Sequence, residues 1–484
     1  MKISKNHLLN FLELQPSTNE LSDALFQLGH EHTIDGDIFD MEFTPNRGDC
    51  LSLFGLARDL NVIFEAKKTI GIYKNDLPSI ELNFHNNARN DCPKISFLNL
   101  EIQKDFKITK YKNYLESYFK DLGISKNNFF TDISNYVAYE LGQPTHCYDY
   151  EKINKTQGIT LEKNTSKTVF KTLKGNSIDL DTQDLVFMNN GGVINLAGVM
   201  GGLSTSCDHQ TSNILLECAY FLPESIIGKS VKYNLHSDAS HKFERGVDPL
   251  CHNLVFRRFI QIVKDHTDII NIGIHRPNSD NYDYKYVDIN LDKVSSILGL
   301  KVSKNFYQTS LEKLGFEFKD KVRIPSYRSD IESQNDIAEE IGRVIGYDKI
   351  KRQKFKLQKK QTHEKVDLET RIKSYLVDNG FYEIINTPFD CKETPQSIQV
   401  DNPLDKNKAF LRTSLKDSMV DNLLFNERRQ KDSIKFFEIS DVYTNPLSKN
   451  VKKKLAIIAS GRMGNNYKNF SQKIDTKVMN DLFK

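Results

Sequence analysis

The sequence lacks the features that would mark a membrane protein, an exported protein or a cysteine-based site. No run approaches the ~18 apolar residues of a membrane span. The opening stretch, MKISKNHLLNFLEL, has no apolar core of signal-peptide length. No two of the seven cysteines stand at CxxC spacing, which excludes a zinc knuckle or redox pair of that type. We therefore expect buried thiols, a cytoplasmic location and no membrane partner.

An excess of charge of one sign is also missing. The 67 basic and 64 acidic residues leave a formal net charge of only +3 over 484 residues. A global basic field is therefore excluded as a means of binding nucleic acid, and any such binding must use local patches. Apolar residues make up 38% of the chain, enough for several ordinary cores. At about 100–200 residues a domain, the length indicates three or four domains.

Hydrophobic periodicity and turn residues predict an α+β, multidomain chain of four segments. Residues 1–75 show helical patterns around a polar turn, and residues 90–265 mix short strands with helices. Residues 284–355 form a small, mainly helical segment, and residues 365–484 begin with a helix followed by strand-like runs. The basic stretch 351–360 between the last two segments is better interpreted as a solvated linker than as a phosphate-contacting strip.

The third segment contains an acidic helix with two interpretations. Its apolar residues recur at helical spacing and predict one buried face, while the carboxylates gather beside it. These carboxylates are Asp330, Asp336, Glu339 and Glu340. A hard cation such as magnesium would relieve their mutual repulsion. Alternatively, Arg343 lies four residues after Glu339 and forms an ordinary surface ion pair, which the spacing alone favours.

The second segment contains polar and glycine-rich stretches that an ordinary core does not need. His146 could act as a general base or orient water, and Glu217 could be a carboxyl group with a shifted pKa. Taken singly, a loop histidine, a strand-end glutamate and a tight turn at Gly201-Gly202 are the better interpretations. No Ser-His-Asp order or nucleophile elbow is present, so covalent catalysis is not supported.

Taken in order, six stretches resemble the β subunit of bacterial phenylalanyl-tRNA synthetase. Together they extend over almost the whole chain, which makes the resemblance very specific, although each motif alone is weak. The stretches are Glu42–Ser52, Glu140–His146, Leu196–Gly202, Ser240–Pro249, Pro325–Tyr347, and Asn402-Pro403-Leu404 through Leu411–Leu415 to Phe436–Ile439.

The resemblance implies an α2β2 enzyme whose α subunit activates phenylalanine with ATP and transfers it to tRNA. Residues 284–355 would be a small helical, winged DNA-binding-like domain. Residues 365–484 would be part of a class II synthetase-like, antiparallel-sheet domain that has lost its catalytic motifs and serves as an interface. The family's magnesium carboxylates fall on Asp330, Asp336, Glu339 and Glu340, which reverses the preference for the ion pair.

The resemblance also implies an editing pocket in residues 90–265 that hydrolyses tyrosine wrongly attached to the phenylalanine tRNA. A pocket for phenylalanine cannot strongly reject an analogue that only adds a hydroxyl, so a second site must recognise it. His146 would orient water or substrate, Glu217 would accept the tyrosine hydroxyl, and Gly198 and Ala239 would leave room for the ring. The whole set carried over by motif position is Ser134, Asn135, His146, Gly198, Glu217, Ser237 and Ala239.

The chain departs from the family pattern in several places. Only the Asp35-Gly36 turn stands where the family inserts an oligonucleotide-binding barrel, and no anticodon-contacting domain follows Lys484. Ser125 stands where an arginine is frequent, and Ser134 where threonine is usual. A non-catalytic RNA-binding or assembly scaffold is the alternative function. An unrelated metal-dependent hydrolase is disfavoured, because no histidine accompanies the acidic cluster.

Overall fold

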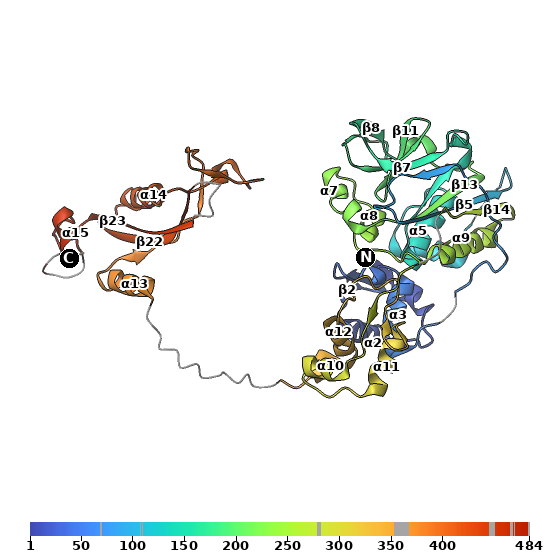
Figure 1. Ribbon diagram of the computed structural model, residues 1–484, viewed down its shortest axis with the longest axis horizontal. Helices are drawn as coiled ribbons and strands as arrows, with labels where there is room; N and C mark the ends of the chain where they lie inside the picture. Colours follow the sequence, from blue (N-terminus) through green and yellow to red (C-terminus); the bar gives the residue numbers. More distant parts are fainter. Residues whose placement is uncertain are drawn as a thin grey trace. The chain divides into compact units, whose positions relative to one another are not determined.

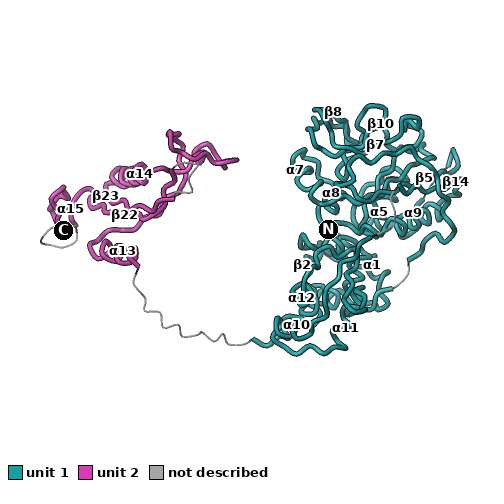
Figure 2. Tube along the Cα trace, in the orientation of Figure 1, with its two compact units in different colours: residues 1–354 teal, residues 355–484 magenta. Residues whose placement is uncertain are grey.

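The computed structural model describes residues 1–67, 70–106, 108, 110–277, 282–352, 367–444, 451–464, 468 and 470–482. The chain divides into two compact units, residues 1–354 and 355–484 (Figures 1 and 2). Most of the predicted basic linker, residues 353–360, lies outside the described residues. The division into four segments stays a prediction, and the two units are treated separately below.

Unit 1 begins with a small antiparallel sheet and three helices. The strand order is β1 (Lys2–Ser4), β3 (Ile38–Glu42), β2 (Glu31–Asp35), and the helices are α1 (Lys5–Leu9), α2 (Thr18–Gln27) and α3 (Leu53–Phe64). The predicted helical pattern between residues 8 and 28 is two helices, because Ser17 and Glu20 form a capping box that starts α2. Strands β2 and β3 are joined directly by the turn at Gly36, whose φ is +59°.

Two stacked sheets form the middle of unit 1 (Figure 1). The antiparallel four-stranded sheet has the order β14 (Ile269–His275), β5 (Lys94–Ile102), β13 (Asn213–Tyr220), β6 (Thr145–Asp149). The five-stranded sheet has the order β12 (Met200–Gly201), β11 (Gly192–Leu196), β10 (Leu185–Asn189), β7 (Ile159–Lys163), β4 (Phe84–Asn86). A hairpin of β8 (Thr168–Lys171) and β9 (Ser177–Leu180) accompanies them. The helices of this region are α4 (Asn113–Leu122), α5 (Phe129–Leu141), α6 (Pro223–Ile226), α7 (Lys229–Lys232), α8 (Asp238–Phe243) and α9 (His252–His266).

The four-stranded sheet separates two hydrophobic cores, and strand alternation decides which side chain enters which core. In β13, Leu216 belongs to the core shared with the amino-terminal elements and helices α4, α5 and α9. Its neighbour Leu215 belongs to the core shared with the five-stranded sheet. Because successive side chains of a strand point to opposite faces, Glu217 faces the same way as Leu215. His146 lies directly opposite Glu217 on β6 and therefore shares this face.

The last part of unit 1 packs three helices with a small antiparallel sheet. The helices are α10 (Leu291–Leu298), α11 (Lys304–Lys313) and α12 (Gln334–Ile345), and the strand order is β15 (Tyr286–Val287), β17 (Val322–Arg323), β16 (Glu317–Phe318). The predicted apolar face of α12 is confirmed, since Ile337 and Ile341 are buried in the local core. The winged DNA-binding-like description of this region stays a prediction.

Unit 2 is built around the long hairpin of β22 (Ser433–Tyr443) and β23 (Val451–Gly461). Strand β18 (Tyr382–Glu383) pairs in parallel with β22, so this sheet is mixed and the prediction of an antiparallel sheet is wrong for it. Helix α13 (Leu368–Asp378) precedes β18. Strands β18 and β22 can be parallel because the chain between them, which includes a second small sheet, forms the long crossover connection that a parallel pair requires. That sheet has the order β19 (Phe389–Asp390), β21 (Phe410–Leu411), β20 (Ile398–Gln399), and the remaining helices are α14 (Lys416–Glu427) and α15 (Thr476–Leu482).

The cysteines follow the sequence prediction with one clear exception. All seven are free thiols, five are buried and Cys207 is half-buried, but Cys391 in unit 2 is exposed. None of the helices in the described part of the chain combines the length and apolarity that a bilayer crossing requires.

Candidate functional site

A cavity of about 860 Å³ in unit 1 brings together several of the predicted editing residues. Ser134 and Asn135 reach it from α5, Thr145 from the start of β6, and Ser237 and Ala239 from the start of α8. The first and last of these residues are more than 100 positions apart in the sequence, so only the tertiary structure brings them to one cavity. Four of the seven predicted pocket residues therefore share one cavity.

Two serines hold the wall of this cavity in place. The Ser134 hydroxyl donates to the Thr145 carbonyl oxygen at 2.7 Å, which ties α5 to β6. The Ser237 side chain caps the N-terminus of α8 by accepting from the Ser240 amide at 3.1 Å. The same Ser237 hydroxyl donates to the Val199 carbonyl oxygen at 2.8 Å. Both serines are thus fixed by the fold, and a small hydroxyl suffices for each role.

His146 follows the cavity residue Thr145 and is held between two other groups. Its ring stands edge-on to Tyr148, with ring centroids 4.4 Å apart. A Cβ atom on Gly201 would come within 2.2 Å of His146 Cε1, so the glycine provides the space that the ring occupies. The Nε2 atom is buried without a hydrogen-bond partner among the described residues. Burial lowers the pKa of His146 to about 4, so the imidazole is neutral near pH 7.

Glu217 lies in the core between the two sheets, and its side chain is 4% exposed. Its Oε2 atom accepts a hydrogen bond from the Tyr148 hydroxyl at 2.7 Å and another from Asn195 Nδ2 at 3.3 Å. Both bonds use Oε2, which leaves Oε1 without one in the described chain. Burial raises the pKa of Glu217 to about 8, so the carboxyl group is mostly protonated near pH 7. Tyr148 and Asn195 were missed by the sequence analysis, since only the sheet register brings them to Glu217.

The two small residues that were expected to leave room for a ring lie in different surroundings. Ala239 borders the cavity. Gly198 has a φ of +69°, and a Cβ atom there would come within 2.8 Å of Ile226 Cδ1 and 3.2 Å of Phe221 Cδ2. The glycine is therefore required by the turn between β11 and β12 and by packing in the core. It is connected to the cavity through its neighbour Val199, whose carbonyl oxygen accepts the bond from Ser237.

The close approach of Gly201 to His146 leads to a prediction. Gly201→Ala is expected to displace the imidazole and to reduce any hydrolytic activity of this region by about tenfold or more, because a misplacement of ~1 Å can cost that much or more. The measurement is the hydrolysis rate of the variant beside that of Gly192→Ala. A Cβ atom on Gly192 would meet nothing closer than Asn189 O at 3.9 Å, so this control adds the same methyl group without a clash. Equal rates for both variants would contradict the prediction.

A second, smaller cavity of about 120 Å³ lies between the amino-terminal region and α12. All four predicted metal-binding carboxylates border it. The sequence prediction that these carboxylates lie near one another is confirmed. They do not have equal roles, because Asp336 belongs to the capping box of α12 and accepts from the Ser333 amide at 2.7 Å. Glu339 is exposed and its carboxylate has no hydrogen bond or ion pair among the described residues.

Two arginines neutralise the other two carboxylates of this cavity. Arg328 contacts both oxygens of Asp330, at 2.8 and 2.9 Å, and donates to Glu340 at 2.7 Å. The predicted surface ion pair between Arg343 and Glu339 is wrong, because Arg343 is buried and pairs with Glu340 and with Asp59 of α3. Spacing along a helix cannot reveal a partner 284 positions away.

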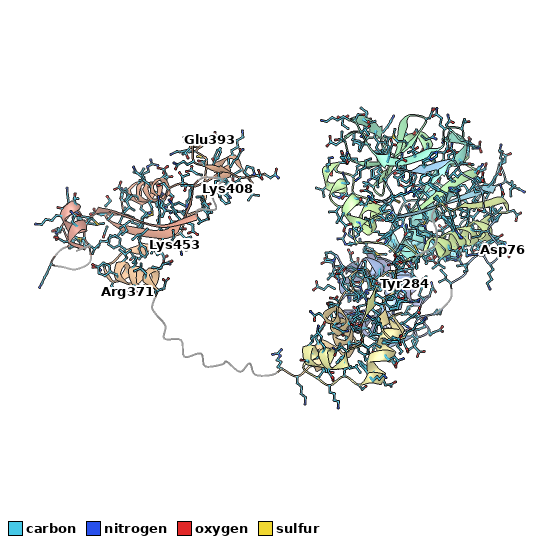
Figure 3. The ribbon with its side chains drawn as sticks, in the orientation of Figure 1. Asp76, Tyr284, Arg371, Glu393, Lys408 and Lys453 are labelled. Atoms are coloured by element: carbon cyan, nitrogen blue, oxygen red, sulfur yellow. The ribbon has the colours of Figure 1, made fainter. Side chains whose placement is uncertain are left out.

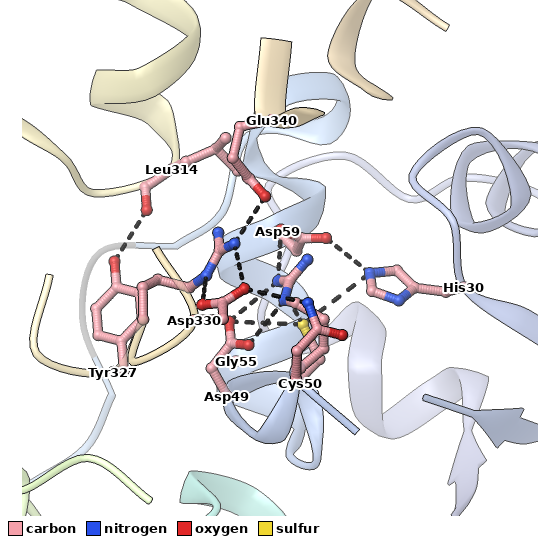
Figure 4. A network of polar contacts seen from close by, with 12 residues as sticks. His30, Asp49, Cys50, Gly55, Asp59, Leu314, Tyr327, Asp330 and Glu340 are labelled. Carbon is pink, nitrogen blue, oxygen red and sulfur yellow. Dashed lines mark hydrogen bonds and ion pairs between the residues drawn. The ribbon is translucent and has the colours of Figure 1, made fainter. Parts of the chain in front are cut away.

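The centre of this network is Asp59, a residue that the sequence analysis missed (Figure 4). Its carboxylate accepts from Arg343 at 2.6 and 2.7 Å, from Arg47 at 3.0 Å and from His30 at 2.7 Å. The arginines Arg343 and Arg47 hold the pKa of Asp59 well below its usual range despite burial. His30, Cys50 and Asp59 lie within 4.8 Å of one another as possible metal ligands, but Arg47 already donates to the last two. The positive charge beside these three residues is therefore supplied by the guanidinium group of Arg47.

Three known domain families match the chain in order. Residues 96–268 match the B3/4 domain, residues 287–347 the tRNA synthetase B5 domain, and residues 351–482 the phenylalanyl tRNA synthetase beta chain CLM domain. The large cavity and Glu217 lie in the first of these. Among solved structures, an N-terminal fragment of the phenylalanyl-tRNA synthetase beta subunit from Pyrococcus horikoshii is 14% identical, with a TM-score of 0.41, and the match covers 71% of this chain and 99% of that one.

Curated relatives agree with the domain matches. The phenylalanine–tRNA ligase beta subunit of Psychrobacter arcticus is 30% identical over 463 residues, which cover 88% of this chain and 56% of the relative. The phenylalanine–tRNA ligase beta subunit of Francisella tularensis is 28% identical, and the match covers 84% of this chain and 53% of the relative. The chain spans about half the length of the curated relatives it matches. Over the part that it spans, the chain belongs to the family of phenylalanine–tRNA ligase beta subunits.

Proposed function

We propose that this chain is the β subunit of a phenylalanine–tRNA ligase. In the proposed α2β2 enzyme, the α subunit uses ATP to attach phenylalanine to its tRNA, and this chain hydrolyses tyrosine that has been attached by error. The names of the relatives support the ligase, and the B3/4 domain match supports an editing region. The observation that carries the editing function is a buried carboxyl group in the same domain as a polar cavity.

Rejection of tyrosine requires a group that recognises a single hydroxyl. Tyrosine differs from phenylalanine only by this group, and a buried polar atom that pairs with it discriminates far better than an apolar pocket. Glu217 supplies such an atom, since both of its hydrogen bonds use Oε2 and leave Oε1 available. Because the carboxyl group is mostly protonated near pH 7 and Oε2 already accepts two hydrogen bonds, Oε1 would carry the proton and donate to the oxygen of a tyrosine hydroxyl. Phenylalanine would leave this group unpaired at a cost of about 1–3 kcal/mol.

Hydrolysis of the ester bond requires a positioned water molecule. The unpartnered Nε2 of His146 is suited to this role, because a neutral imidazole accepts a hydrogen bond and can hold a water molecule near the ester carbonyl. Ser134 and Asn135 border the cavity with groups that can bind the terminal ribose of the tRNA. No residue of this set is needed as a covalent nucleophile.

The deciding experiment is hydrolysis of tyrosyl-tRNA for phenylalanine by the purified chain, alone and with the cognate α subunit. Release of tyrosine, with phenylalanyl-tRNA left largely intact, is the expected result. The matched control is the same tRNA charged with phenylalanine, since it differs from the substrate by one oxygen atom. A stable α–β complex that releases no tyrosine would instead favour the alternative function, an assembly scaffold without editing activity.

We further propose that the small acidic cavity holds magnesium. Asp336 and Glu339 are the best ligands, because neither lies in an arginine fork and magnesium is commonly held by one or two carboxylates and several water molecules. Asp330 and Glu340 would join the ligand set only when Arg328 releases them. A bound magnesium ion would supply positive charge that offsets the repulsion between Asp336 and Glu339.

Glu339→Gln is expected to reduce the magnesium dependence of α–β assembly without unfolding the chain, since this carboxylate has no partner among the residues that the structure describes. The measurement is sedimentation of the mixed subunits with magnesium and with a chelator. Glu81→Gln is the control, because Glu81 is also exposed and lies outside this cavity. A chelator effect of equal size in the wild type and in Glu339→Gln would exclude Glu339 as a ligand.

A further inference from the structure

A third cavity, of about 590 Å³, lies at the N-terminus of α9, away from both sites described above. It is bordered by the first turn of this helix, at His252 and Asn253, and by Lys94, Arg257 and Arg276. The acidic residue on its border is Asp76, which is exposed at the surface of unit 1 (Figure 3). Three cationic side chains therefore border the cavity, against one carboxylate.

The start of α9 provides unpaired amide groups toward this region. The helix is 15 residues long, its N-cap Cys251 makes no side-chain capping bond, and its first turn contains no acidic residue. The first amides of a helix have no partner within it and carry partial positive charge. A helix N-terminus without a cap or an acidic residue is suited to an anion.

A buried histidine provides an independent indication. His252 is 4% exposed, and its Nδ1 atom lies 3.1 Å from the Ser96 hydroxyl. Its Nε2 atom is buried without a partner among the described residues, which is costly for a polar atom. Burial, together with the positive charges of Lys94 and Arg276, lowers the pKa of His252 to about 3, so the ring is neutral. A ligand that accepts a hydrogen bond would satisfy this atom.

The arginines of the cavity bind uncharged oxygens of the chain and keep further donors. Arg257 donates from Nη1 to the carbonyl oxygens of Tyr73 and Asn75, at 2.8 and 2.9 Å. Arg276 donates from Nη2 to the Asn253 side chain at 3.0 Å. In the described part of the chain neither arginine has a carboxylate partner. Guanidinium groups held in this way bind phosphate oxygens well, because their planar donors match the oxyanion.

From these observations we propose that the cavity at the N-terminus of α9 is a phosphate-binding site that uses His252, Arg276 and Arg257. The phosphate belongs either to the backbone of an RNA strand or to a small free phosphate compound, since both present the same oxyanion. The proposal does not depend on the editing function, because none of these residues borders the large cavity.

The test uses the full chain at constant ionic strength. Inorganic phosphate binding is measured by titration calorimetry, and binding of a short single-stranded RNA by fluorescence anisotropy. Arg276→Gln removes one cationic donor, and His252→Asn keeps an amide near the position of Nδ1 while removing Nε2. Each variant is expected to weaken binding by about tenfold, the effect of losing one charge-assisted hydrogen bond. Lys155→Gln is the control, since it removes one positive charge from the same domain outside the cavity.

Phosphate binding that both variants weaken would support a site for a free phosphate compound. RNA binding that both weaken, without measurable binding of inorganic phosphate, would support a backbone contact. Binding that neither variant changes, or the absence of binding to both probes, would overturn the proposal. If His252→Asn lowers the thermal stability of the chain, Arg276→Gln decides the outcome, because Arg276 is exposed and, among the described residues, its side chain hydrogen-bonds to Asn253 alone.

Discussion

Glu217→Ala is expected to slow hydrolysis of tyrosyl-tRNA by about ten- to a hundredfold, the loss that follows from removing one hydrogen bond to a buried carboxyl group. Charging of phenylalanine by the assembled enzyme should be nearly unchanged, because the proposed synthetic site is on the α subunit. The measurement compares tyrosine release and phenylalanine attachment in the same preparation. Unchanged hydrolysis of mischarged tRNA would exclude Glu217 from tyrosine recognition.

Glu217→Gln is the control for this variant, because the amide keeps the shape, an oxygen that can accept from Tyr148 and Asn195, and an N–H that can donate in place of Oε1. It is expected to retain most of the discrimination and to change the pH dependence of stability. The folded pKa of Glu217, about 8, lies above the unfolded value near 4.5. The folded chain therefore holds an extra proton between these values, and its free energy of unfolding falls as pH rises through this window. This fall should be smaller in Glu217→Gln when urea unfolding is followed from pH 5 to pH 9.

Asp59→Ala is expected to lower the free energy of unfolding of unit 1 by about 3–5 kcal/mol, the cost of removing one partner from a buried ion pair. The substitution leaves the guanidinium groups of Arg47 and Arg343 without their shared carboxylate. It also removes the ion pair that joins α3 to α12, two helices far apart in the sequence. Both effects lower the free energy of unfolding.

The measurement for Asp59 is urea unfolding followed by circular dichroism. Asp23→Asn is the control, since Asp23 is exposed on α2 and its loss should change the free energy by no more than about 0.5 kcal/mol. Equal midpoints for the two variants would mean that the arginines are satisfied by solvent or by Glu340. Asp59→Ala also removes the hydrogen bond between His30 Nε2 and Asp59 and leaves this nitrogen with the longer contact to Cys50 Sγ at 4.0 Å.

The predicted editing residues show how far motif order reaches. Ser134, Asn135, Ser237 and Ala239 were assigned by their position in motifs, and all four border one cavity. Their convergence could not be derived from spacing, because α5 and α8 are far apart in the sequence and several strands lie between them along the chain. Glu217 shows the opposite case. The strand itself was predicted, but the prediction of a strand-end glutamate is wrong, because β13 continues to Tyr220. The partners Tyr148 and Asn195 come from two other strands.

The acidic helix illustrates the same limit for charge. Its apolar face and the grouping of its carboxylates follow from the 3.6-residue period and were predicted. The ion pairs of the helix were not predicted, because the partners lie outside it. Arg328 pairs with Glu340, and Asp59 of α3 pairs with Arg343. A helical pattern defines neighbours three and four positions apart, but an ion pair in a core depends on which elements pack together.

The sequence by itself determined the membership of the family and the apolar face of the acidic helix α12. These properties depend on local periodicity and on motif order, which are present in the chain before it folds. Only the tertiary structure decided that Glu217 is buried with one free oxygen, that Asp59 joins two distant helices, and that His252 and three basic residues border one cavity. Each of these depends on the distance between segments far apart in sequence, and burial then sets the pKa and the hydrogen-bonding demand of every polar group that the packing encloses.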